Sequence, residues 1–217
     1  MNTLYALLMG YFLGSIPFGL ILTRLAGLGD VRSIGSGNIG ATNVLRTGSK
    51  KLAAGTLVLD LIKGFLPVYL ADKLFYEGYL LPDASFGPMA AAALGAVVGH
   101  CFPVWLKFKG GKGVATNAGV SFGLGWPIGL AYALVWLGVL AITRISSLAG
   151  MSAVVAAAIA AASFGYQEFI PVLMVIAALI IWLHRENIGR LMVGEEPKIG
   201  SKKTVVGQAE DQDDEEA

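Results

Sequence analysis

Long apolar stretches alternate with short polar segments along most of this chain. A helix that crosses the hydrocarbon core of a membrane needs about 20 predominantly apolar residues, and several stretches approach that length. The pattern predicts an all-α protein, a polytopic membrane bundle of helices. Outside one ambiguous region, the predicted crossing helices are 3–23, 51–71, 88–106, 147–163 and 168–183.

The ambiguous region is the apolar stretch 113–143. Its 31 residues would extend roughly 46 Å as one helix, which is too long for a single crossing. Gly125-Trp126-Pro127, near the middle, favours a turn followed by a new helix. The sequence therefore predicts two short crossings here, 113–125 and 127–143, and seven transmembrane helices in all.

The positions of the basic residues support seven crossings. With the N-terminus outside and the C-terminus in the cytoplasm, the predicted inside segments hold 14 of the 16 Lys and Arg residues, as the positive-inside rule requires. A single crossing over 113–143 would place the Lys107–Lys112 loop and the C-terminal segment on opposite sides of the membrane, which would break this charge bias. The inside residues are Arg24, Arg32, Arg46, Lys50, Lys51, Lys107, Lys109, Lys112, Arg144, Arg185, Arg190, Lys198, Lys202 and Lys203.

Composition agrees with an integral membrane protein. Hydrophobic residues make up 55% of the chain and charged residues 14%, whereas soluble domains carry about 25% charged residues. The single cysteine, Cys101, excludes an intrachain disulfide. Residues 1–25 lack a basic start and a small-residue cleavage site, so we expect a retained first helix and no signal peptide.

The end of the chain differs from the rest. Six of the 15 acidic residues fall between Glu210 and Glu216, a composition typical of a solvated, disordered segment. We therefore expect an integral membrane domain over 1–200 and an acidic cytoplasmic tail over 201–217.

Three polar, glycine-rich segments carry the candidate chemistry, and the predicted topology places all three on one face of the membrane. They are 35–46, 107–113 and 184–190. Glycines let a backbone approach an anion closely, and Lys, Arg, Asn and Ser side chains supply hydrogen-bond donors. The three segments together predict a site for a phosphorylated substrate at the membrane surface.

The first two segments resemble known nucleotide loops only superficially. Residues 35–40 match G-x-G-x-x-G, but no strand–loop–helix context surrounds them, so the dinucleotide reading is rejected. Gly111-Lys112 is followed by Gly113 and not by Ser or Thr, which excludes a Walker A loop. Phosphate binding remains for both segments, since Gly110–Gly113 lies at a predicted helix start. A flexible polar loop is the alternative for 35–46.

The histidines give no sign of a metal site, because two histidines and one cysteine have no chelating spacing. We expect His100 to be a packed core residue. His184 shares a helix face with Asn187, and the two side chains either bind one substrate or bond each other. Ser147 caps a helix or contacts a ligand, and Asp60 and Lys63 form a structural ion pair.

Several enzyme classes are excluded. No H-x-x-x-x-D motif is present, since Trp105 and Gly189 stand five residues after the two histidines. No Gly-x-Ser-x-Gly elbow supports a hydrolase triad. The positive charge is explained by topology, so nucleic-acid binding is not supported.

Taken together, the motifs resemble the bacterial acyl-phosphate:glycerol-3-phosphate acyltransferase family. The resemblance covers nearly the whole chain. Ile39 departs from it, because proline is common at that position, and so does the acidic tail. The motifs that carry it are Gly14-Ser15-Ile16-Pro17, Gly35–Arg46, Gly99-His100-Cys101-Phe102-Pro103, Phe108–Thr116, Ser146-Ser147-Leu148 and His184–Arg190.

The resemblance implies a seven-helix protein of the bacterial cytoplasmic (inner) membrane, with its site on the cytoplasmic face. It implies transfer of a fatty acyl group from acyl-phosphate to the 1-hydroxyl of glycerol 3-phosphate. The products would be lysophosphatidic acid and phosphate. Neither a metal nor another cofactor is implied, and the partners are the two substrates and membrane lipid.

The expected site follows from the resemblance and from the donors at hand. We expect catalytic roles for Ser36, Lys112, His184 and Asn187, with Asn187 as a donor to the developing oxyanion. The departing phosphate or His184 would accept the hydroxyl proton. The expected substrate-binding residues are Gly37, Asn38, Gly40, Thr42, Asn43, Arg46, Gly110, Gly111 and Ser147.

Two other functions fit parts of the sequence. A membrane transporter of an organic phosphate also has basic, glycine-rich loops, but its polar groups belong at the membrane midplane. The hypothesis of a scaffold subunit in a lipid-synthesis complex does not explain the glycines and the hydrogen-bond donors.

Overall fold

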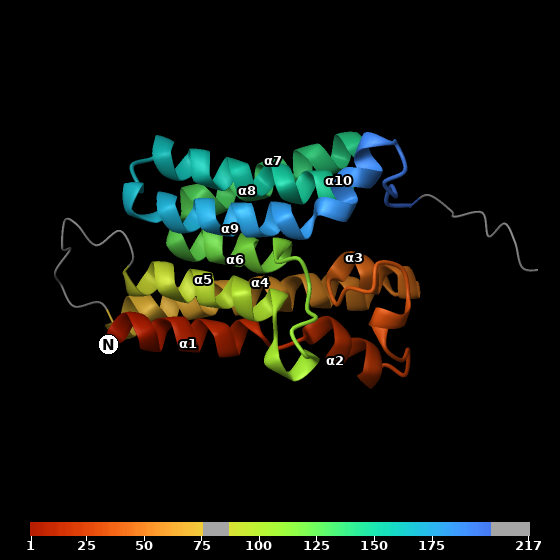
Figure 1. Cartoon of the computed structure of the whole chain (residues 1–217), viewed down its shortest axis with the longest axis horizontal. Helices are drawn as coiled ribbons and strands as arrows, with labels where there is room; N and C mark the ends of the chain where they lie inside the picture. The colour runs from red at the N-terminus through yellow and green to blue at the C-terminus, as the bar shows by residue number, and fades with distance from the viewer. Residues whose placement is uncertain (76–86, 201–217) are drawn as a thin grey trace, which may run out of the picture.

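The computed structural model describes residues 1–75 and 87–200, and every regular element in these ranges is helical. The prediction of an all-α bundle is confirmed. Most helices run along one long axis, with the N-terminus at one end and α2, α3 and α10 at the other (Figure 1). The α-helices are α1 (Asn2–Gly14), α2 (Phe18–Leu25), α3 (Ala41–Val44), α4 (Lys50–Phe75), α5 (Pro88–Cys101), α6 (Val114–Leu124), α7 (Trp126–Thr143), α8 (Ser146–Ser163), α9 (Ile170–Leu183) and α10 (Arg185–Met192). Four short 3₁₀ turns join them, η1 (Val31–Ser33), η2 (Leu45–Thr47), η3 (Val104–Leu106) and η4 (Gln167–Phe169).

Helix-helix contacts rely on small residues. A Cβ atom placed on Gly14 of α1 would lie 2.1 Å from the carbonyl oxygen of Ala96 on α5. Gly64 of α4 meets the Thr116 carbonyl of α6 in the same way, at 2.0 Å. Such close backbone approach is how helices associate in lipid, where apolar burial alone provides no driving force.

Among the described residues, five helical segments are long and apolar enough to cross a membrane, or up to six if the bent pair α9–α10 counts as one span. The fold is therefore that of a multi-pass membrane protein. The stretch 113–143 divides as predicted, because α6 ends at Leu124 and α7 begins at Trp126. With 11 residues, α6 extends only about 16 Å, so seven full crossings stay a prediction.

The first predicted span, 3–23, is interrupted between α1 and α2. Pro17 has no N–H and caps the start of α2. The carbonyls freed by the break are satisfied from other helices, since Trp105 Nε1 donates to the Ser15 oxygen at 2.8 Å and Lys63 Nζ to the Ile16 oxygen at 2.7 Å. The break is therefore a built feature and not a frayed end.

Lys63 also forms the ion pair predicted with Asp60, at 2.7 Å between Nζ and Oδ1, and both side chains are buried. His100 lies beside them, with Nδ1 3.9 Å from the same carboxylate oxygen. The histidine is a packed core residue, as predicted. Buried charges in a membrane protein need partners, and Lys63 and Asp60 supply each other, whereas His100 Nδ1 lies beyond hydrogen-bond distance of the carboxylate.

Candidate functional site

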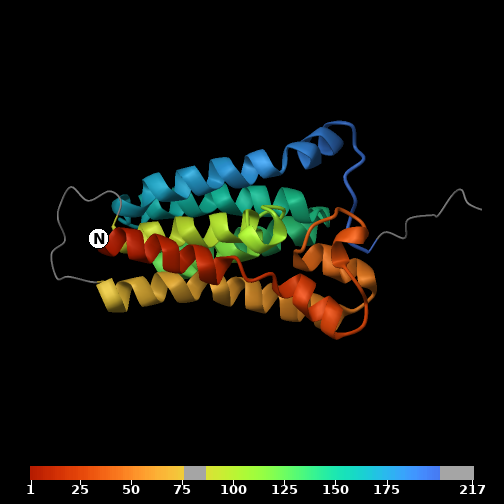
Figure 2. The ribbon, with the colours of Figure 1, turned by 60° about the horizontal axis from the view of Figure 1, so that its bottom comes forward.

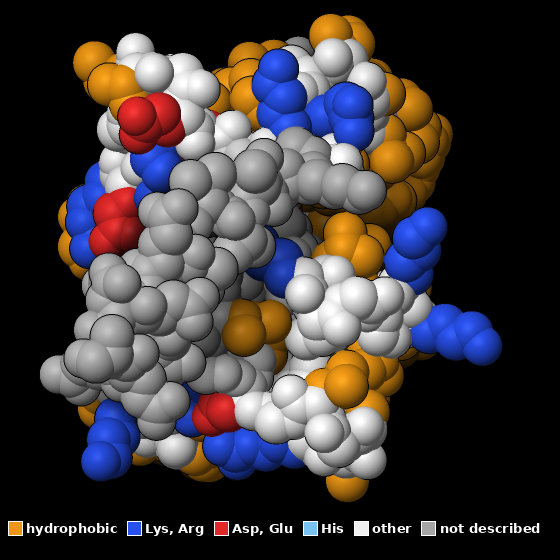
Figure 3. Space-filling model, turned by 90° about the vertical axis from the view of Figure 1, so that its right-hand side faces the viewer, with side chains coloured by type: hydrophobic (Ala, Val, Ile, Leu, Met, Phe, Trp, Pro, Cys, Tyr) orange, Lys and Arg blue, Asp and Glu red, His pale blue; other side chains and the backbone are white. Residues whose placement is uncertain are grey.

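The three polar segments meet at the end of the bundle opposite the N-terminus. Figure 3 looks onto this end, where Lys and Arg side chains surround a central hollow. A cavity of about 210 Å³ lies between the segments. Its lining consists of Ser36, Asn38, Cys101, Phe102, Phe108, Lys109, Gly110, Gly111, Lys112, Leu183, Arg185 and Glu186.

The segment 35–46 is organised around Asn43, whose side chain is 2% exposed. Its Nδ2 donates to the carbonyl oxygens of Val31 at 2.7 Å and Asn38 at 2.8 Å. Its Oδ1 accepts from the Ser36 amide at 3.1 Å. Asn43 therefore shapes the loop that presents Ser36 and Asn38 to the cavity, and its predicted contact with substrate stays a prediction.

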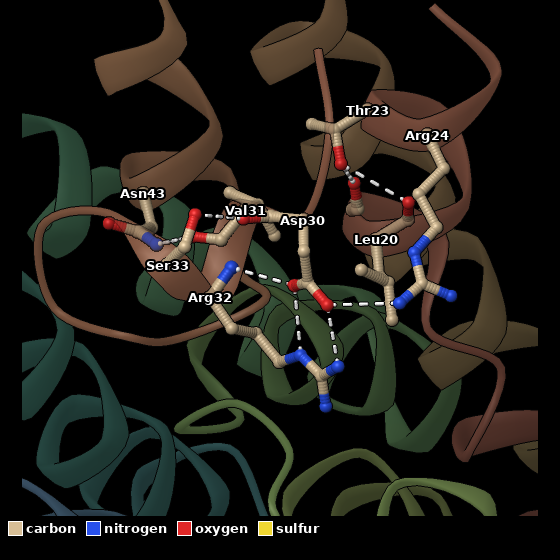
Figure 4. Close-up of polar contacts among 9 residues, drawn as sticks. Leu20, Thr23, Arg24, Asp30, Val31, Arg32, Ser33 and Asn43 are labelled. Atoms are coloured by element: carbon tan, nitrogen blue, oxygen red, sulfur yellow. Dashed lines mark hydrogen bonds and ion pairs between the residues drawn. The ribbon is translucent and has the colours of Figure 1, made fainter. Parts of the chain in front are cut away.

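Asp30 anchors the chain that leads into this loop, through contacts with Arg24 and Arg32 (Figure 4). Its carboxylate accepts from the Arg32 backbone amide and Nε, each at 2.9 Å, and from Arg32 Nη2 at 2.6 Å. Arg24 Nη2 donates to the same group at 2.9 Å. The Arg32 guanidinium in particular holds the pKa of the Asp30 carboxyl well below its usual range. Neither arginine lines the cavity.

The glycines of segment 107–113 serve close packing. The amides of Gly110 and Gly111 donate to the Cys101 and His100 carbonyls, each at 3.1 Å, so these two N–H groups are already used within the protein. A Cβ on Gly111 would lie 2.2 Å from His100 Nε2. The loop is thus pressed onto the C-terminal end of α5, which brings Lys112 to the cavity wall.

Lys112 is half-buried and donates from Nζ to Asn187 Oδ1 on α10. Desolvation lowers the pKa of the Lys112 ammonium, an effect that the nearby Glu186 carboxylate opposes. The lysine is therefore held in place as a desolvated cation, which is suited to bind a phosphate.

Asn187 is fixed in turn by Glu196, a residue outside the three polar segments. The Glu196 Oε1 atom accepts from Asn187 Nδ2 at 2.5 Å and from Ser147 Oγ at 2.6 Å. Its Oε2 atom accepts from Arg190 Nε at 2.8 Å. Burial alone would raise the pKa of the Glu196 carboxyl, but these three donors outweigh it and the pKa lies below its usual value.

No simple sequence signal points to Glu196. It lies beyond the end of α10, in an irregular segment where helical spacing no longer predicts which residues meet. The same segment is held by Arg144, whose backbone carbonyl accepts from the Ile199 amide at 2.8 Å and whose guanidinium Nη2 donates to the Ile199 carbonyl at 2.9 Å. The described part of the C-terminal segment therefore closes over this side of the site.

His184 is buried at the junction of α9 and α10. Its Nδ1 lies 2.7 Å from the Ile180 carbonyl oxygen, which can only accept, so this nitrogen carries the proton and Nε2 holds the lone pair. Among the described contacts, the side chain of Asn187 pairs with Lys112 and Glu196 and not with His184. The suggested bond between His184 and Asn187 is therefore not formed here.

Only some of the predicted site residues line the cavity. Thr42 Oγ1 lies 3.0 Å from Ser146 Oγ, a contact that links segment 35–46 to the start of α8. Ser36, Asn38, Gly110, Gly111 and Lys112 line the cavity. The others lie outside its lining, namely Gly37, Gly40, Thr42, Asn43, Arg46, Ser147, His184 and Asn187.

The sequence matches known proteins over most of its length. The family model for glycerol-3-phosphate acyltransferase matches residues 4–194. A glycerol-3-phosphate acyltransferase of Erythrobacter litoralis is 70% identical over 197 residues, which cover 91% of this chain and 95% of that relative. One of Novosphingobium aromaticivorans is 61% identical, covering 93% of this chain and 98% of its own length. The chain belongs to the glycerol-3-phosphate acyltransferase family.

Solved structures agree with this membership. A crystal structure of PlsY, an integral membrane glycerol 3-phosphate acyltransferase in its glycerol 3-phosphate form, is 41% identical. It superposes with a TM-score of 0.83, covering 92% of this acyltransferase and 96% of that chain. The lysophosphatidic acid form gives 40% identity and a TM-score of 0.81. The family named from the motifs and the multi-pass membrane fold are confirmed, and neither the transporter nor the scaffold reading is favoured.

Proposed function

We propose that this acyltransferase moves a fatty acyl group from an acyl phosphate to the 1-hydroxyl of glycerol 3-phosphate. The products are lysophosphatidic acid and inorganic phosphate. The observation that carries this proposal is the meeting of Ser36, Asn38 and Lys112, from two distant segments, at one cavity. Family membership supports it, as do the glycerol 3-phosphate and lysophosphatidic acid forms of the related PlsY structures.

Acyl transfer from an acyl phosphate depends more on binding and positioning the two substrates than on a strong nucleophile. The hydroxyl oxygen attacks the acyl carbonyl carbon, the carbon–oxygen bond to phosphate breaks, and phosphate leaves with the electron pair. Ser36, Asn38 and Lys112 hold the donor phosphate, while Arg46, Ser147 and His184 are proposed to hold glycerol 3-phosphate. Holding the two reactants in contact supplies much of the rate.

The proton of the attacking hydroxyl needs an acceptor. We assign it to the departing phosphate, which becomes more basic as the bond breaks. His184 is the rival base, since the tautomer inferred above leaves a lone pair on Nε2. Asn187 retains one amide hydrogen beyond the bond to Glu196, and we propose that it donates to the carbonyl oxyanion.

The proposed topology keeps seven crossings, with the N-terminus outside and the site on the cytoplasmic face of the bacterial inner membrane. The position of the basic residues supports this, because the segments that carry Lys112, Arg144 and Arg190 lie at the site end. Lys73 lies near the end of α4, at the opposite end of the bundle (Figure 1). The acidic tail proposed for 201–217 lies outside the described residues.

The test uses purified full-length protein in detergent or lipid, with palmitoyl phosphate, glycerol 3-phosphate and no added metal. Phosphate and lysophosphatidic acid are measured together. If the wild type forms phosphate and lysophosphatidic acid in equal amounts and Lys112→Ala forms neither, the proposal is supported. Phosphate without lipid product would show hydrolysis in place of transfer. If neither product forms while another acyl donor supports transfer, the acyl-phosphate assignment is wrong.

A further inference from the structure

An apolar stripe runs along the outer face of α9 towards the cavity. Met174, Val175 and Trp182 are 60%, 53% and 54% exposed. Val175 stands seven residues and Met174 eight residues before Trp182, and Ala178 between them is also exposed. The four side chains therefore lie on one side of the helix. This side faces lipid in a membrane-spanning helix, so the stripe offers a continuous apolar track.

Arg185 stands at the end of that track, one turn beyond Trp182. Its guanidinium carbon lies 4.6 Å from the centre of the Trp182 ring, within the range of a cation–π contact. The same side chain lines the cavity together with Lys112. Arg185 therefore belongs both to the lipid-facing stripe and to the polar site.

The charge of Arg185 is not committed to an ion pair. Among the ion pairs of the described residues, none includes Arg185, and its recorded side-chain hydrogen bond goes to the Trp182 carbonyl at 3.3 Å. Glu186 lines the same wall, so Arg185 also offsets a carboxylate that would repel an anion. The guanidinium retains donors for a phosphate, which it can bind in a bidentate manner.

The length of the track fits one membrane leaflet. From Met174 to Arg185 the helix rises roughly 16 Å at 1.5 Å per residue, about half of a hydrocarbon core of about 30 Å. A lipid whose chain lies beside this stripe would hold its head group at Arg185. The bend of 59° between α9 and α10 turns the chain away at that level (Figure 2).

We propose that the acyl-phosphate donor reaches the site laterally from the membrane, with its chain along this α9 stripe, and that Arg185 receives its phosphate at the lipid side of the cavity. The inference rests on the proposed function for the nature of the donor. It assigns to Arg185 a binding role towards the donor, distinct from the binding of glycerol 3-phosphate.

The test compares Arg185→Ala, Arg185→Lys and a control, Lys51→Ala, which removes an exposed positive charge at the same end of the molecule and outside the cavity. We expect Arg185→Ala to raise the KM for palmitoyl phosphate about tenfold or more, as for a lost charge-assisted bond. Arg185→Lys should raise it less, and the KM for glycerol 3-phosphate should change less than about twofold. An unchanged donor KM, or a larger effect on glycerol 3-phosphate, would overturn the proposal.

A binding measurement separates this inference from the proposed reaction. Hexadecyl phosphate, an unreactive lipid phosphate, is titrated against wild type, Arg185→Ala and Trp182→Ala, with inorganic phosphate as the second probe. Both variants should bind hexadecyl phosphate more weakly than wild type does, whereas Trp182→Ala should bind inorganic phosphate with unchanged affinity. Equal binding of hexadecyl phosphate by all three proteins would refute the entry site even if transfer is confirmed. If the wild type binds it in an Arg185-dependent manner without transferring palmitate, only the reaction is wrong.

Discussion

Lys112 donates a hydrogen bond to the side-chain oxygen of Asn187, although 75 residues separate them in sequence. The amide nitrogen of Asn187 donates in turn to Glu196. A cation is thus linked through a neutral amide to a carboxylate, and the amide is held in one orientation. The chain of contacts places the ammonium of Lys112 at the cavity without neutralising it by direct ion pairing.

The first prediction concerns that ammonium. Lys112→Ala removes a desolvated donor to phosphate, so kcat/KM should fall by about 100-fold, the equivalent of ~3 kcal/mol for a charged hydrogen bond. Lys112→Arg should retain part of the activity. Lys107→Ala, in the same loop but outside the cavity lining, serves as the control, and a comparable loss there would assign the effect to the loop as a whole.

The second prediction is a pH dependence. Because burial lowers the pKa of Lys112, the side chain loses its charge at a lower pH than an ordinary lysine. The rate of the wild type should therefore decline on the alkaline side earlier than expected for a free lysine. In Lys112→Arg the charge persists, so the decline should move to higher pH. Spontaneous hydrolysis of the donor is subtracted at each pH, and an unmoved alkaline limb would contradict the assignment.

The third prediction separates the two proton acceptors. If the departing phosphate takes the proton, His184→Gln keeps a rate within about tenfold of wild type, since loss of a general base costs about 10²–10⁴-fold. The measurement is the pH–rate profile of His184→Gln and His184→Ala. Loss of the acidic limb together with a large fall in kcat in both variants would make His184 the base.

The fourth prediction concerns Glu196. Replacing it with Ala leaves Ser147, Asn187 and Arg190 without their acceptor, so the free energy of unfolding should fall by ~1–3 kcal/mol and activity should fall with it. Glu196→Gln should lose less stability, because it still accepts. Glu195→Ala, at the exposed neighbouring position, is the matched control, and thermal unfolding in detergent is the readout. Equal midpoints for all three variants would rule out the structural role.

The fifth prediction uses two glycines. Gly111→Ala would place a methyl group 2.2 Å from the His100 ring, so the loop must move and carry Lys112 away from Asn187. We expect at least about a tenfold loss in activity, since small displacements of positioning groups are costly. Gly189→Ala meets no atom within 4 Å and should leave activity unchanged. Normal activity of Gly111→Ala would show that the loop is held in place by other contacts.

Some of the site was visible in the sequence because its signals are local. Glycines beside donors predict phosphate binding in segments 35–46 and 107–113, and residues of both segments line the cavity. The charge bias predicts that both segments lie on one side of the membrane. The sequence did not show that several of these polar groups form hydrogen bonds within the protein. Asn43 donates within its own loop, and the amides of Gly110 and Gly111 turn inward to α5, because each donor bonds the nearest acceptor that the packed helices provide.

The sequence by itself determined the membrane class, the all-helical architecture, the division of 113–143 and the family, since hydropathy, turn residues and ordered motifs are properties of adjacent residues. Only the tertiary structure decided that Lys112 meets Asn187, that Glu196 fixes Asn187, and that Arg185 joins the α9 stripe to the cavity. Those contacts depend on where irregular segments and helix ends come to rest. No spacing rule predicts them, because they follow from helix packing and from the strong tendency of buried polar groups to find hydrogen-bond partners.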